Sequence, residues 1–158
     1  MSHRIITLQV PSPAAGADWS LVPSQTDHCR LFAVTALLTT SATVANRRPA
    51  LALADLNALT YYSSDCEYPQ VASLAVRYSW AWGASNNVPT ALVTGERCSL
   101  GLPRIDLRPA DTVESVTLGI QAGDQWSSII WRGLVGDSWE DEELGSVLAV
   151  ALGAGPRN

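Results

Sequence analysis

The chain has 158 residues, about the length of one domain, and its ten basic residues are all arginine. Without lysine it has no residue for a Schiff base, a Walker-type phosphate loop or a lysine general base. Its net charge is −5 and its arginines are scattered, so we expect no direct binding of nucleic acid.

Alternation of apolar and polar residues with a period of two dominates the chain and predicts half-buried strands. In chain order these are Arg4–Val10, Leu31–Leu38, Val44–Ala54, Leu59–Ser63, Val71–Trp82, Ile105–Leu107, Thr112–Gln121, Trp126–Val135 and Gly145–Leu152. Short strands separated by Gly, Pro, Asp and Asn predict an all-β fold. We expect a single, jelly-roll-like β-sandwich of eight to nine strands with little helix.

Two of these strands carry further information about their position. Leu31–Leu38 is apolar on both faces, which predicts a central strand or one covered by a neighbouring subunit. Pro49 interrupts its strand, which indicates an edge position or a bulge. The best candidates for a helical turn are Ala14–Trp19 and Trp139–Leu144.

We expect one sandwich domain over residues 1–158. Residues 1–29 form an N-terminal strand and loop arm, 30–135 the core sandwich, and 136–158 an acidic turn and C-terminal strand. The apolar segment Ile5–Val10 ends at Pro11, too early for a signal peptide, and no apolar run approaches the ~18 residues of a membrane span. We therefore expect a protein made in the cytoplasm, with no membrane partner.

The residues that usually carry chemistry are few. Cys29, Cys66 and Cys98 are an odd, widely spaced set, which argues against a disulfide framework and a zinc site and favours buried, inert thiols. No Gly-x-Ser-x-Gly motif or His-rich metal triad occurs. Candidate carboxylates lie in or beside turns, where aspartate normally caps the backbone: Asp111, Glu114 and Asp124. We expect no enzyme, no cofactor and no metal site.

Six tryptophans outnumber the single phenylalanine. Trp80 and Trp82 share a strand face with apolar residues, which favours core or intersubunit packing. Trp126 and Trp131 have odd spacing in one predicted strand, so they should point to opposite sides, one of them toward an interface. These four are the candidate interface residues. Stacking of exposed tryptophans on sugar rings stays open as an alternative.

Two stretches carry a family resemblance. The first is residues 37–49, with a Thr-x-x-x-x-Ala-Asn-Arg turn at 40–47, followed by the strand 50–54; the second comprises residues 101–103, 107–111, 115–121 and 123–127. Together they resemble small β-sandwich virion proteins of tailed bacteriophages. The resemblance implies a virion structural protein, most naturally a capsid decoration or head accessory subunit, with a neck or tail component as the alternative. The partners implied are other virion proteins and further copies of the chain.

The same resemblance implies turn and packing roles for certain residues and no catalytic ones. Asn46 would tolerate the left-handed backbone conformation, and Arg47 would clamp backbone carbonyls or a carboxylate. Asp124 would cap the turn that enters the Trp126 strand, and Pro49 and Asp111 complete the set. A carbohydrate- or receptor-binding module with exposed tryptophans is the rival from another class, although a glycan partner is not favoured.

Overall fold

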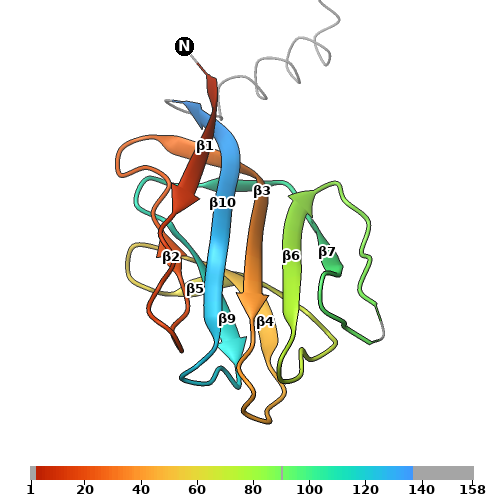
Figure 1. Ribbon diagram of the computed structural model, residues 1–158. Helices are drawn as coiled ribbons and strands as arrows, with labels where there is room; N and C mark the ends of the chain where they lie inside the picture. Colours follow the sequence, from red (N-terminus) through yellow and green to blue (C-terminus); the bar gives the residue numbers. More distant parts are fainter. Residues whose placement is uncertain (1–2, 90, 137–158) are drawn as a thin grey trace, which may run out of the picture.

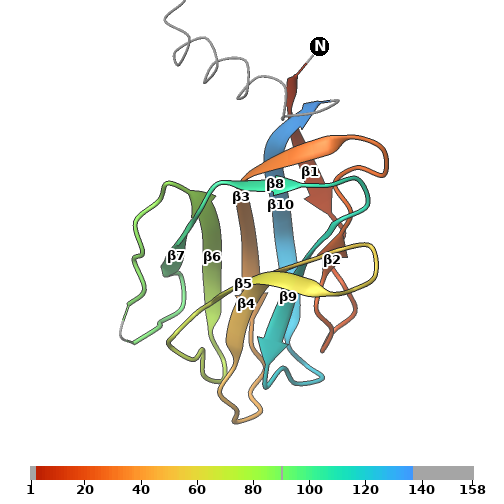
Figure 2. The ribbon, with the colours of Figure 1, turned by 180° about the vertical axis from the view of Figure 1, so that it is seen from behind.

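The computed structural model describes residues 3–89 and 91–136 as a two-layer β-sandwich (Figures 1 and 2). Its ten strands are β1 (Arg4–Val10), β2 (Ser20–Leu21), β3 (His28–Thr39), β4 (Arg48–Ala54), β5 (Thr60–Asp65), β6 (Ala75–Trp82), β7 (Arg97–Leu102), β8 (Ile105–Leu107), β9 (Thr112–Leu118) and β10 (Gln125–Gly136). One sheet has the order β1-β10-β3-β6-β7, with β8 also paired to β3, and the other has the order β2-β9-β4-β5. No helix occurs in the described residues, so the all-β prediction is confirmed.

The strands pair as nested antiparallel partners, which produces the jelly-roll arrangement. β1 pairs with β10, β2 with β9, β3 with β6, and β4 with β5. The pairs β10–β3 and β9–β4 then join these ribbons within each sheet. β7 and β8 are additions between β6 and β9: β7 runs parallel to β6 at the sheet edge, and β8 pairs with the first part of β3.

The core lies between the two sheets and is rich in aromatic side chains. Tyr78 stacks on Trp80 with ring centroids 5.7 Å apart and meets Trp126 edge-on at 5.9 Å. Aliphatic residues fill the space around these rings, among them Leu31, Leu38, Leu51, Leu53 and Ile129. Burial of each large aromatic removes about 150–250 Å² from water, so this cluster contributes much of the hydrophobic stabilisation.

A bulge in β10 places both of its tryptophans in the core, contrary to the prediction from their spacing. The register of β10 against β3 shifts between Ser127 and Ile130, and Ser128 adopts a left-handed φ of 49°. One extra residue reverses the alternation of side chains along the strand. Trp126 and Trp131 therefore both point inward and are fully buried.

The predicted strand positions agree with the structure, while their ends differ. The segment 44–47 precedes β4 as loop, and β2 and β7 were not predicted. The helix expected at Ala14–Trp19 is absent: a single turn closes at 14–17, where the Ala17 N–H donates to the Ala14 carbonyl. It goes no further because the Asp18 carboxylate accepts hydrogen bonds from the Thr117 N–H (2.9 Å) and the Ser115 hydroxyl (2.7 Å) of β9. The predicted elements Trp139–Leu144 and Gly145–Leu152 lie outside the described residues.

The structure resolves the two positional questions. Leu31–Leu38 lies within β3, a central strand between β10 and β6. Pro49 lies in β4, which is internal between β9 and β5, and the β4–β5 irregularity falls at Leu53, so the edge or bulge prediction is wrong. The proline is tolerated because it exchanges no hydrogen bond with its β9 partner: the Thr117 N–H donates to Asp18, and the Pro49 carbonyl accepts the Cys66 N–H on the other side.

Candidate functional site

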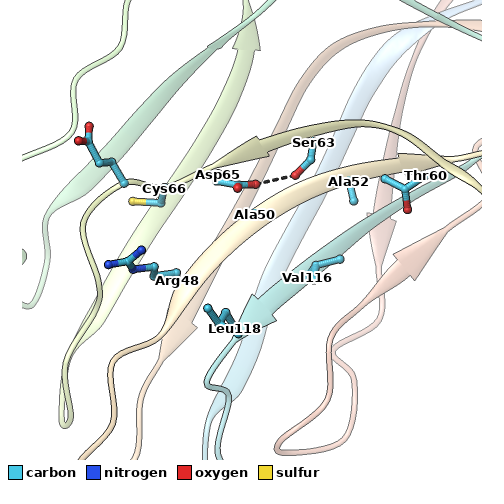
Figure 3. A pocket seen from close by; sticks show the side chains of 10 residues that line it. Arg48, Ala50, Ala52, Thr60, Ser63, Asp65, Cys66, Val116 and Leu118 are labelled. Atoms are coloured by element: carbon cyan, nitrogen blue, oxygen red, sulfur yellow. Dashed lines mark hydrogen bonds between the residues drawn. The ribbon is translucent and has the colours of Figure 1, made fainter.

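A groove crosses the outer face of the four-stranded sheet, on the side away from the core (Figure 3). Its volume is about 600 Å³. It is lined by Arg48, Ala50, Ala52, Thr60, Ser63, Asp65, Cys66, Glu67, Val116 and Leu118, which come from β4, β5, β9 and the residues after β5. We call this feature the outer groove.

The alternation within β4 creates the floor of the outer groove. Leu51 and Leu53 point into the core, so Ala50 and Ala52 between them point outward. Both alanines are nevertheless buried, because the longer side chains of the neighbouring strands rise on either side of them. The small residues on the central strand therefore hollow the sheet along its length.

The two walls of the outer groove differ in chemistry. On the β9 side, Val116 lies opposite Ala50 and Leu118 opposite Arg48, and these aliphatic side chains are 49 % and 69 % exposed. On the β5 side, the Ser63 hydroxyl donates to the Asp65 carboxylate at 2.5 Å. The groove thus offers apolar contact along one wall and hydrogen-bond acceptors along the other.

The end of the outer groove near Arg48 also contains Glu67, so acidic and basic groups both line it. In the described part of the chain, no group of three or more His, Cys, Asp or Glu side chains is placed to hold a metal ion. The arrangement suits recognition of an apolar segment that also carries hydrogen-bond donors. The signal in the sequence was the run Pro49–Ala54, where alanine alternates with leucine, but nothing there shows which face is solvent-exposed.

The predicted turn residues Arg47 and Asp124 lie together at one end of the sandwich. The Arg47 Nε donates to Asp124 Oδ2 at 2.8 Å and Nη2 donates to Oδ1 at 2.9 Å, with both side chains fully buried. Arg47 also donates to the Ala45 carbonyl, and Asp124 accepts from the N–H groups of Ser41 and Gln121. The pair therefore joins the β3–β4 loop to the β9–β10 turn.

The remaining predicted turn residues lie apart from this ion pair. Asn46 is exposed, and its φ is not positive, so the left-handed conformation expected there does not occur. Asp111 is buried, accepts the Arg108 N–H at 2.9 Å and the Tyr61 hydroxyl at 3.0 Å, and so closes the turn before β9. Burial of the Tyr61 phenol, together with the Asp111 carboxylate, raises the pKa of Tyr61.

The candidate interface tryptophans divide into core and surface. Trp80, Trp126 and Trp131 are fully buried, so their assignment to an interface is wrong. Trp82 shares its strand with Trp80 but lies at the end of β6, where it is 50 % exposed and stacks on Phe32 with ring centroids 6.0 Å apart.

No family model, curated protein or solved structure matches this chain. Within the described residues, no helix is long and apolar enough to cross a membrane. The outer groove and the exposed Trp82 are the surface features of the described residues that bear most directly on function.

Proposed function

We propose that this chain is a non-enzymatic structural subunit of a tailed-bacteriophage particle, made in the host cytoplasm and carried in the virion. Its leading role is that of a capsid decoration or head accessory subunit, present in many copies. It would contact neighbouring virion proteins, including further copies of itself, through the outer groove.

The observation that carries this proposal is the surface of the outer groove. Val116 and Leu118 expose aliphatic side chains beside an alanine floor, in a sheet face that no other element of the described chain covers. Exposed aliphatic side chains beside a groove suit contact with a partner. The jelly roll fits this role, since viral capsid domains use it; lectins and cupins use it too, so the fold alone does not name a function.

Particle labelling tests the proposal directly. Antibody raised against the chain, with gold detection on purified particles of the source phage, should label the heads, and mass spectrometry should count hundreds of copies per particle. Label confined to the neck or tail, with few copies, would move the subunit to that location. Absence of the chain from both intact and disrupted particles would refute the virion proposal.

Trp82 supports a second candidate function, a carbohydrate- or receptor-binding module. An exposed indole face next to Phe32 is a platform on which a sugar ring can stack. This proposal predicts that a bound glycan changes the tryptophan fluorescence and that Trp82→Ala removes the response without unfolding the protein. A Leu118→Asp variant is the matched control, because it alters the outer groove and leaves the Trp82 platform intact.

A further inference from the structure

Cys66 and Cys98 meet across the sandwich although they are 32 residues apart in sequence. Cys66 directly follows β5 in the four-stranded sheet, and Cys98 is the second residue of β7 in the six-stranded sheet. Both are free, buried thiols, and their Sγ atoms are 3.5 Å apart. A disulfide requires about 2.05 Å between the sulfurs, so an approach of about 1.5 Å would join the two sheets.

The two thiols differ in reactivity. The hydrogen bond with Cys98 lowers the pKa of Cys66, because the neighbouring S–H stabilises the Cys66 thiolate; the same contact raises the pKa of Cys98. Cys66 also lines the end of the outer groove, from which a small reagent can approach once the side chains there shift. Cys66 is therefore the thiol that reacts first.

The third thiol provides an internal reference. Burial, with the charge of Asp27, raises the pKa of Cys29 to about 11, and its Sγ donates to the Asp27 carbonyl oxygen at 3.9 Å. Cys29 is in β3 and does not line the outer groove. A reagent that reports thiolate character should leave Cys29 unmodified in the folded protein.

We propose that Cys66 and Cys98 are an oxidation site that forms an intramolecular disulfide on contact with a small-molecule disulfide such as oxidised glutathione. Cys66 loses its proton and its thiolate attacks one sulfur of the reagent, which forms a mixed disulfide and releases one glutathione thiolate. Cys98 then loses its proton and attacks the Cys66 sulfur, which releases the second thiolate. Two electrons pass from the protein to the reagent, and the two released thiolates take up the two protons.

The disulfide would act at the edge of the six-stranded sheet. β7 is an edge strand that pairs only with β6 among the named strands, and the bond would tie it to the opposite sheet. Cross-linking residues this far apart restricts the unfolded chain, so we expect the melting temperature to rise by about 10 °C on oxidation. Reduction should return the original value.

The test is a thiol count on the folded wild-type protein after incubation with oxidised glutathione, followed by denaturation and alkylation. We expect one alkylated cysteine, Cys29, an intact mass lower by two hydrogen atoms before alkylation, and a peptide that links Cys66 to Cys98. Cys29→Ser should form the same disulfide and keep no free thiol, whereas Cys66→Ser and Cys98→Ser should not form it.

Three results would overturn the proposal. They are three alkylated cysteines after incubation, a glutathione adduct that persists on Cys66, and a disulfide that involves Cys29 or joins two chains. Because the mass and the melting temperature are compared between oxidised and reduced wild-type protein, the test does not depend on whether the serine variants fold.

Discussion

Arg47 and Asp124 form a two-point ion pair with both side chains fully removed from solvent, 77 residues apart in sequence. Ser41 completes the arrangement: its N–H and hydroxyl both donate to the Asp124 carboxylate, at 2.8 Å and 3.0 Å. A buried charge is tolerated when its counter-charge and its hydrogen bonds are in place. The pair therefore holds the ends of two different strand connections in one geometry.

Substitution of Asp124 by asparagine should lower the free energy of unfolding by about 3–5 kcal/mol, because the Arg47 charge would stay buried without its partner. Urea unfolding of Asp124→Asn against wild type measures this. Asp106→Asn is the matched control: Asp106 pairs with Arg30 and Arg104 at the surface, and its loss should cost less than about 1 kcal/mol. Equal losses for the two variants would contradict a special role for the buried pair.

The same carboxylate should make stability depend on pH. Burial opposes ionisation of Asp124, but hydrogen bonds from Arg47, Ser41 and Gln121 outweigh it and hold its pKa below the ordinary value of 3.8. Because the pKa of Asp124 is lower in the folded than in the unfolded state, its carboxylate stabilises the fold above about pH 4. This stabilisation is lost as the pH falls through the folded-state pKa. Melting curves between pH 7 and pH 3 should show that the difference in melting temperature between wild type and Asp124→Asn becomes smaller as the pH falls. A difference that stays constant over this pH range would argue against Asp124 as the source of the pH dependence.

The bulge in β10 should be sensitive to the residue at position 128. Ser128 has a φ of 49°, where a side chain is strained and glycine is not. We expect Ser128→Gly to be neutral or stabilising by up to about 1 kcal/mol, and Ser128→Val to be destabilising by more than that. Thermal unfolding of both variants measures the difference. At the neighbouring Ser127, whose φ is not positive, the valine variant should be more stable than the glycine variant. If glycine were the more stable variant at both positions, the bulge would not be the cause.

The proposed contact surface predicts a loss of binding without a loss of stability. Leu118→Asp places a charge on the aliphatic wall of the outer groove and should weaken attachment to particles at least tenfold, measured by co-sedimentation of added protein with particles depleted of it. Leu118 is 69 % exposed, so the melting temperature should change little. Leu56→Asp, at a residue 70 % exposed but outside the outer groove, should bind as wild type does. Equal binding by both aspartate variants would exclude the outer groove as the contact.

The strands could be predicted because each sheet has one apolar and one polar face, so alternation along segments such as β1 and β6 was visible in the sequence. β7 was missed although Cys98, Leu100 and Leu102 alternate on one face, because the residues between them, Ser99 and Gly101, give only a weak polar signal. The direction of Trp131 could not be predicted, since one inserted residue reverses the alternation and leaves no mark in composition.

The candidate sites were beyond sequence reasoning for a different reason. The partners Arg47 and Asp124, and likewise Cys66 and Cys98, come from distant segments, and only the strand order brings them together. The outer groove depends on which face of β4 meets the core, and the alternating run 50–54 allows either. Local patterns thus predicted the elements, while every contact between distant elements required the topology.

The nested pairing of the strands imposes an order on synthesis at the ribosome. Arg4 at the start of β1 lies opposite Val135 near the end of β10, and among the described strands β1 pairs with β10 alone. β1 therefore leaves the ribosome long before its partner, and its edge must stay exposed while some hundred and twenty further residues are translated. Such non-local pairing is slow, on the order of milliseconds to seconds for comparable folds. During that interval the nascent chain is open to pairing with another copy, so high expression should favour strand-exchanged aggregates over the native subunit.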